Sequence, residues 1–128
     1  MQFDTLITNG RIIDGSGAPE SCGGVGIRNG RITAVGGLEG AAAEQHLDAA
    51  GLIIAPGFID VHTHSDVYIL LEPTAPSKLY QGVTTEIAGN CGASAAPLSG
   101  SMHLPSDWRS KPLAIEWSTV AGYRDVLR

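Results

Sequence analysis

The feature that most constrains the fold is His62-Thr63-His64, which closes an apolar run from Leu52 to Val61. Alternate side chains of a β-strand share one face, so both imidazoles point the same way and can bind one cation or bracket a pair. Residues two apart on a helix do not share a face. Cys91 lies 27 positions after His64, within Gly89-Asn90-Cys91-Gly92. Imidazole and thiolate together suit zinc best among the common metals, so these residues predict a zinc site.

Composition excludes several other classes of protein. The chain has 128 residues, of which 43% are hydrophobic, and this predicts a globular protein of about one domain. The net charge is −5 and no basic stripe is present, so we expect no nucleic-acid partner. No apolar run approaches the length of a membrane span and Met1-Gln2-Phe3-Asp4 does not begin a signal peptide, so we expect a cytoplasmic protein without a membrane partner. Cys22 and Cys91 are not expected to form a disulfide.

The first part of the chain contains a short internal repeat. The sequence Asn9-Gly10-Arg11-Ile12 recurs as Asn29-Gly30-Arg31-Ile32. Asn-Gly between short β-branched segments is the strongest local hairpin signal, because a type I′ turn needs positive φ at both central residues. We therefore expect a hairpin at each copy, loops over residues 15–24 and 36–43, and an antiparallel β module over residues 1–54.

After Pro56-Gly57 the pattern changes to strand, helix, strand. Pro76 can begin a short helix through Tyr80, and residues 83–88 are expected to form a second buried strand that leads to Cys91. Parallel strands joined by a helix occur in barrels and doubly wound sheets, where functional residues lie at the carboxyl ends of the strands. Residues 95–112 are expected to form a loop, and Ser118 or Thr119 can cap a final helix.

The motifs from Pro56 to His64 resemble the amidohydrolase superfamily. Gln81-Gly82-Val83-Thr84-Thr85-Glu86, which leads to Gly89-Asn90-Cys91-Gly92, is similar to the N-acyl-D-amino-acid deacylases, or D-aminoacylases. The resemblance runs from residue 3 to the segment from Trp117 to Tyr123, except for residues 99–111. It implies zinc-dependent hydrolysis of the amide bond of an N-acylated D-amino acid, which is then the small-molecule partner.

The resemblance also assigns roles to individual residues. It implies that His62, His64 and Cys91 are metal ligands. The further histidines and the aspartate that serves as general base in such enzymes have no counterpart here, so no catalytic residue is assigned, and His103 is not taken as a ligand. Asp60, Asp66 and Asn90 are expected to support the ligands from behind.

The architecture that the resemblance implies is α/β: an N-terminal β-sandwich-like module over residues 1–54, followed over residues 55–128 by the start of a metal-dependent (β/α)₈ barrel. A whole barrel takes about 250 residues, so we expect the barrel to be incomplete in this chain. Two strands cannot close a barrel and leave open edges. We therefore expect the isolated chain to be marginally stable and inactive without the remainder of the barrel as partner.

Two alternatives stay open. Another amidohydrolase, such as a dihydroorotase or hydantoinase, commonly has an arginine two places after the second histidine, where this chain has Asp66. Those relatives also bridge their metals with a carboxylated lysine and do not need Cys91. The other alternative is a non-catalytic fragment in which residues 1–54 act as an interaction module.

Overall fold

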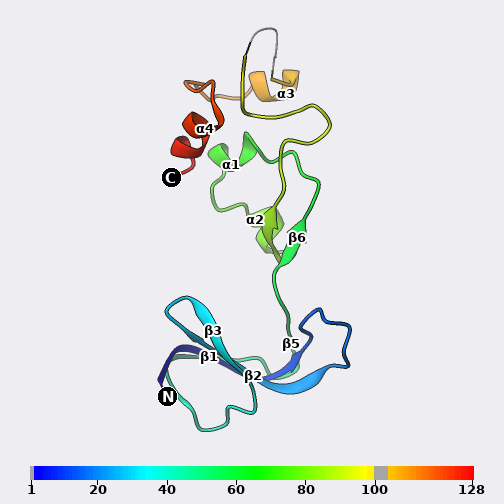
Figure 1. The fold of residues 1–128 in the computed structure, drawn as a ribbon, viewed down its shortest axis with the longest axis vertical. Coiled ribbons are helices and arrows are strands. Elements are labelled where there is room, and N and C mark those ends of the chain that lie inside the picture. Colours follow the sequence, from blue (N-terminus) through cyan, green and yellow to red (C-terminus); the bar gives the residue numbers. More distant parts are fainter. Residues whose placement is uncertain (1, 100–103) are drawn as a thin grey trace. The chain divides into compact units, whose positions relative to one another are not determined.

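We obtained a computed structural model of the chain, which describes residues 2–99 and 104–128 (Figure 1). The contacts divide the chain into two compact units, Met1–Pro56 and Gly57–Arg128. Among the described residues, the helices are too short or too polar to cross a membrane.

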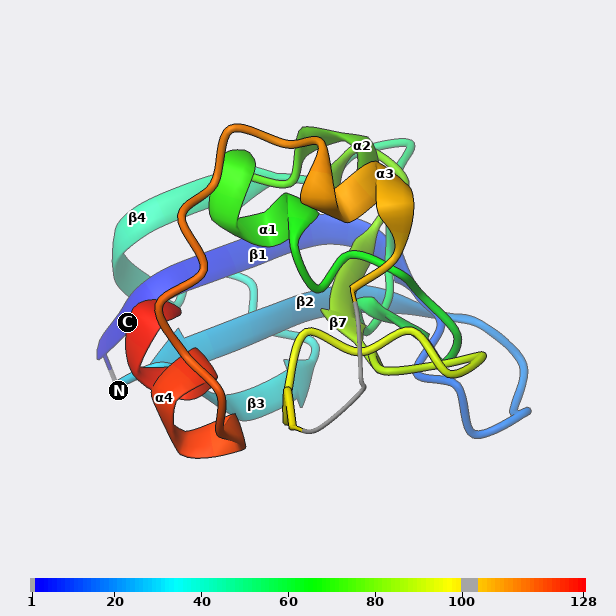
Figure 2. The same ribbon diagram turned by 90° about the horizontal axis from the view of Figure 1, so that it is seen from above.

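The first unit is a five-stranded sheet, and Figure 2 shows four of its strands in the order β3-β2-β1-β4. The fifth strand, β5, also pairs with β1. Its strands are β1 (Gln2–Ile12), β2 (Ser21–Arg28), β3 (Arg31–Gly36), β4 (Ala42–Asp48) and β5 (Ile53–Ile54). β1 runs antiparallel to β2 but parallel to β4 and β5. The expected antiparallel module is therefore wrong, and the sheet is mixed. After the β2–β3 hairpin the chain crosses to the other edge of β1, and a strand that returns by such a crossover enters in the parallel direction.

The two Asn-Gly copies have different structures. Asn29 and Gly30 have φ values of 51° and 68° and join β2 to β3, which confirms the second hairpin. Asn9 also has a positive φ, of 61°, but it lies inside β1, where the register with β2 shifts between Ile7 and Gly10. The first copy is thus a β-bulge, and the hairpin expected there is wrong.

The bulge at Asn9 is held by contacts from β4 and β5. The Asn9 side-chain amide donates a hydrogen bond of 2.9 Å to Asp48 Oδ1 at the end of β4. A Cβ at Gly10 would lie 2.5 Å from Ile54 Cγ1, so glycine admits the side chain of β5 at this point. Contacts with β4 and β5 therefore let β1 continue through the Asn-Gly pair, so the chain does not turn there.

A small group of buried apolar side chains forms the core of the first unit. Its buried apolar residues are Phe3, Leu6, Ile12, Val25 and Ala49. Leu6, near the middle of β1, is only 1% exposed. Burial of a side chain of this size contributes about 1.5–3 kcal/mol.

The second unit begins with two short parallel strands. Its elements are β6 (Phe58–Asp60), α1 (Tyr68–Leu71), α2 (Pro76–Leu79), β7 (Val83–Glu86), α3 (Ser106–Arg109) and α4 (Val120–Val126). β6 and β7 are parallel, and the chain between them contains α2, as the strand-helix-strand pattern predicted. The apolar run of residues 52–61 is divided between β5 and β6 and does not form one strand.

A separate apolar cluster forms the core of the second unit. Its buried members are Val67, Ala95, Leu104, Trp108 and Trp117. Both tryptophans are packing residues, and α3 lies in the segment that we expected to be a loop. Thr119 caps α4, because its hydroxyl accepts a 3.0 Å hydrogen bond from the Gly122 N–H, which confirms the predicted cap.

Candidate metal centre

The candidate ligands follow the carboxyl ends of β6 and β7. The strand ladder continues past β6, because Ile87 N–H donates to Asp60 O at 2.8 Å and Thr63 N–H donates to Ile87 O at 3.2 Å. These bonds fix the backbone of the residue between the two histidines. Cys91 follows β7 in a turn in which its own φ is 54°. This left-handed conformation is uncommon for a residue other than glycine and is typical of functional sites.

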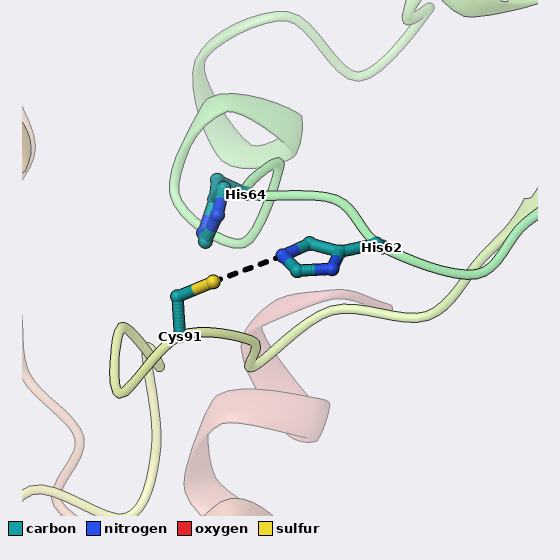
Figure 3. Close-up of side chains that lie close together, drawn as sticks. All are labelled: His62, His64 and Cys91. Atoms are coloured by element: carbon teal, nitrogen blue, oxygen red, sulfur yellow. Dashed lines mark hydrogen bonds between the residues drawn. The ribbon is translucent and has the colours of Figure 1, made fainter.

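The structure brings the side chains of His62, His64 and Cys91 together (Figure 3). One potential ligand atom from each lies within 4.8 Å of the other two. Cys91 Sγ is hydrogen-bonded to His62 Nε2 at 3.0 Å. The imidazole centroids are 5.5 Å apart, and the ring planes are inclined by 68°.

This donor set fits a zinc-type ion. Donor atoms around a tetrahedral zinc lie roughly 3.5 Å apart, so small side-chain rotations would let all three residues reach one ion. Three protein ligands leave a fourth position open, as in catalytic zinc sites. All three side chains are exposed, which leaves that position accessible. The spacing also allows the ligands to be shared between two ions.

A group of charged side chains lies behind the histidines. Lys78 Nζ, from α2, is 2.7 Å from Asp60 Oδ2 on β6 and 2.9 Å from Glu86 Oε1 on β7. Asp60 was expected to support the ligands, and its Oδ1 accepts a hydrogen bond of 3.2 Å from the backbone N–H of His62. Sequence reasoning missed Lys78 and Glu86. The one signal for Glu86 was its charge at the end of an otherwise uncharged strand.

The charged group perturbs the pKa of each of its members. Hydrogen bonds from Lys78 and from the His62 backbone lower the pKa of Asp60 below its ordinary value. Hydrogen bonds to Asp60 and Glu86 raise the pKa of Lys78. Burial acts to raise the pKa of Glu86, but hydrogen bonds from Lys78, Ser65 and Thr63 outweigh it, so this pKa is lowered. All three groups are therefore charged at neutral pH.

The other two residues expected behind the ligands bond to the backbone. Asn90 Nδ2 donates to Ile87 O at 2.7 Å and to Thr63 O at 3.3 Å, which links the turn before Cys91 to the histidine segment. Asp66 is 4% exposed, and its Oδ1 accepts a 3.3 Å hydrogen bond from the Ala95 N–H. Among the described residues, Asp66 Oδ2 has no hydrogen-bond partner.

The remaining histidines and cysteine lie outside this group. Cys22 is in β2 of the first unit, and both cysteines are free, so no disulfide forms. His46 is in β4 of the first unit. His103 lies outside the described residues.

Two histidines and a cysteine thus lie together after adjacent parallel strands, as a group that could hold a metal ion, and the comparisons identify the family. The model of the amidohydrolase family matches residues 45–126, and the chain belongs to this family. It is similar to D-aminoacylase from Alcaligenes xylosoxydans xylosoxydans, with 43% identity over 127 residues that cover 98% of this chain and 26% of that protein. The resemblance to the D-aminoacylases is thus confirmed.

Two solved structures extend the comparison. A D-aminoacylase, described as having a binuclear metal centre, matches with a TM-score of 0.87 and 40% identity over 98% of this chain and 27% of its own. N-acyl-D-glutamate deacylase from Bordetella bronchiseptica, solved with zinc and a phosphonate inhibitor, matches with a TM-score of 0.87 and 41% identity over 99% of this chain and 27% of its own. The chain spans about a quarter of the length of these relatives.

Proposed function

We propose that this chain supplies the first metal ligands of a zinc-dependent N-acyl-D-amino-acid deacylase. The observation that carries the proposal is the convergence of two imidazoles and one thiol within 4.8 Å. The relatives named above are deacylases, and one was solved with zinc. His62 and His64 would bind through ring nitrogens, and Cys91 would bind as a thiolate, a form that a nearby dication favours.

The chemistry follows from the donor set. Zinc in such a site lowers the pKa of a water molecule from 15.7 to roughly 7 and polarises the scissile carbonyl group. His62, His64 and Cys91 would hold the ion, and Asp60 holds the His62 backbone. A carboxylate that takes the proton from water and passes it to the leaving amine must come from outside the residues assigned here.

The exposed apolar residues support the proposal that β6 and β7 are the first strands of a (β/α)₈ barrel. Phe58, Ile59 and Val61 are 61%, 62% and 70% exposed. Apolar strand residues of a barrel pack against neighbouring strands and the surrounding helices. Residues 1–54 would then belong to the accompanying β-sandwich, and the isolated chain would be inactive.

A chimera tests this function directly. The first quarter of the Alcaligenes D-aminoacylase is replaced by this chain, and release of D-methionine from N-acetyl-D-methionine is measured with added zinc. We expect turnover that is lost in the same chimera carrying His62→Ala. A folded chimera without turnover would refute the deacylase assignment. Turnover by the isolated chain above its own His62→Ala control would refute the expected inactivity.

A further inference from the structure

The residue between the two histidines faces away from the candidate metal centre. Thr63 is 5% exposed. Its hydroxyl lies 2.8 Å from Ser65 Oγ, 3.1 Å from Glu86 Oε1 and 3.3 Å from Lys78 Nζ. The imidazoles of His62 and His64 are exposed and lie near Cys91, whereas the Thr63 hydroxyl is buried among Ser65, Glu86 and Lys78. Because Thr63 joins the two histidines in the chain, contacts that hold Thr63 also restrict the backbone that carries both imidazoles.

Lys78 connects this threonine to the backbone of the first histidine. Its ammonium group contacts Asp60, which accepts the His62 N–H, and Glu86, which accepts hydrogen bonds from Thr63 and Ser65. One cation thus joins the ends of β6 and β7. The three hydrogen-bond donors of an ammonium group match its three observed acceptors, namely Asp60, Glu86 and the Thr63 hydroxyl.

Among the described residues, Lys78 is the one positive charge between the carboxylates of Asp60 and Glu86, and it keeps the two close together. The side chains of Asp60, Lys78 and Glu86 are 29%, 27% and 19% exposed, so solvent only partly screens them. Without the ammonium group, two carboxylates would share one site and repel each other. Removing one partner of a partly buried charge group costs more than the pair contributes, because the remaining charge is left unpaired.

We propose that Lys78 is a positioning residue, which holds the His62-Thr63-His64 segment in the geometry that a metal ion requires. It acts through Asp60 and through Thr63 and does not touch the ion. The inference rests on the proposed function for the identity of the bound group. Residues behind metal ligands typically change metal affinity by 10- to 100-fold, so a loss of about that size is expected when Lys78 is replaced.

The test compares Lys78→Met with Lys111→Met in the 128-residue chain. Lys111 belongs to the same unit but lies over the ring of Tyr68, and among the described residues the ion pairs of Asp60 and Glu86 are with Lys78. Cobalt replaces zinc as the probe, because its absorption reports thiolate ligation. Lys78→Met is expected to weaken cobalt binding about 10- to 100-fold and to alter the thiolate band, whereas Lys111→Met leaves both unchanged. Wild-type affinity and an unchanged band in a folded Lys78→Met variant would overturn the proposal.

A second variant covers the case in which Lys78→Met does not fold. Lys78→Arg keeps the positive charge but replaces a compact ammonium group with a planar fork that cannot occupy the same position. It is expected to fold and to bind cobalt more weakly than the wild type. If folded Lys78→Arg binds cobalt as the wild type does, the positioning role is wrong.

Amide hydrogen exchange in the metal-free chain separates this inference from the proposed function. The amides of His62 and Thr63, bonded to Asp60 Oδ1 and Ile87 O, should exchange faster in Lys78→Met, while the Tyr123 amide in α4 keeps its rate. If the wild-type chain binds no cobalt through sulfur, the proposed metal site fails, and faster exchange at the two amides still supports the positioning role. Equal exchange rates in Lys78→Met and Lys111→Met would overturn it.

Discussion

Each of the two units of the chain is stabilised internally by a different kind of interaction. In the first unit, β1 forms backbone ladders with β2, β4 and β5, and strands of six to eleven residues supply most of the order. In the second unit the strands have three and four residues and the helices four to seven. Side chains that bond to backbone atoms hold its loops, as Trp117 does to Ala95 O at 2.8 Å. The stability of the sheet therefore comes from packing and regular strand pairing. The stability of the unit with the candidate site comes from individual side chains that bond to loop backbone.

The largest expected effect of this difference is at Leu6. Leu6→Ala removes a side chain that is 1% exposed in the centre of the sheet and should lower the free energy of unfolding of the first unit by about 2–5 kcal/mol. Urea unfolding followed by circular dichroism measures it. Leu52→Ala is the control, since Leu52 is 61% exposed and its loss should cost less than about 0.5 kcal/mol. Equal effects of the two changes would contradict the packing account.

The two cysteines extend the comparison to metal binding. Cys91→Ser removes one of three converging ligand atoms and should weaken zinc binding by more than about 100-fold, since even residues behind the ligands contribute 10- to 100-fold. Competition with a chromophoric chelator measures the affinity. Cys22→Ser in the first unit should bind zinc as the wild type does. Zinc binding that depends on Cys22 would place the ion in the wrong unit.

The sequence predicted the features that depend on neighbouring residues. The Asn29-Gly30 turn, the Thr119 cap and the strand-helix-strand pattern around α2 all follow from local backbone preferences. The grouping of His62, His64 and Cys91 was also predictable, because the carboxyl ends of adjacent parallel strands meet at one edge of a sheet.

Features that depend on distant parts of the chain were not predicted. β4 contains Glu44, Gln45 and His46, so its sequence lacks the apolar pattern of a strand, and it pairs with β1 only because the chain crosses the sheet. Asn9-Gly10 is identical to the hairpin pair in sequence but lies inside β1, where it is held by contacts from β4 and β5. Lys78 lies 18 positions from Asp60 and carries no local sign that the two meet.

A smaller effect on the free energy of unfolding is expected from deprotonation of Tyr123, whose hydroxyl group bonds α4 to the rest of the second unit. The hydroxyl donates to Asp66 O at 2.6 Å, and burial, together with the charge of Asp66, raises the pKa of Tyr123 to about 12. A raised pKa means that the folded state resists deprotonation, so the contribution to stability is complete below pH 10 and is lost as the pH rises towards 12. We expect the free energy of unfolding to fall by about 1–2 kcal/mol across this range, after allowance for partial exposure.

Two variants check that the alkaline loss comes from this hydroxyl group. Urea unfolding at pH 9, 10 and 11 should show a smaller decline in Tyr123→Phe than in the wild type. Tyr80→Phe should decline as the wild type does, because Tyr80 is 93% exposed. The same decline in all three proteins would assign the pH dependence to other groups.

Effects of the same size or smaller are expected at the β2–β3 turn, where two variants test backbone conformation alone. Gly30 has a φ of 68° and nothing lies within 4 Å of where its Cβ would be, so Gly30→Ala adds no clash and tests backbone strain by itself. The left-handed conformation costs a residue with a Cβ about 1–2 kcal/mol. Asn29→Gly, at a φ of 51°, replaces a residue that tolerates this conformation with one that adopts it freely, and should change the free energy of unfolding by less than about 0.5 kcal/mol. Urea unfolding of the two variants gives the difference, and a neutral Gly30→Ala would show that the turn does not need positive φ at both central residues.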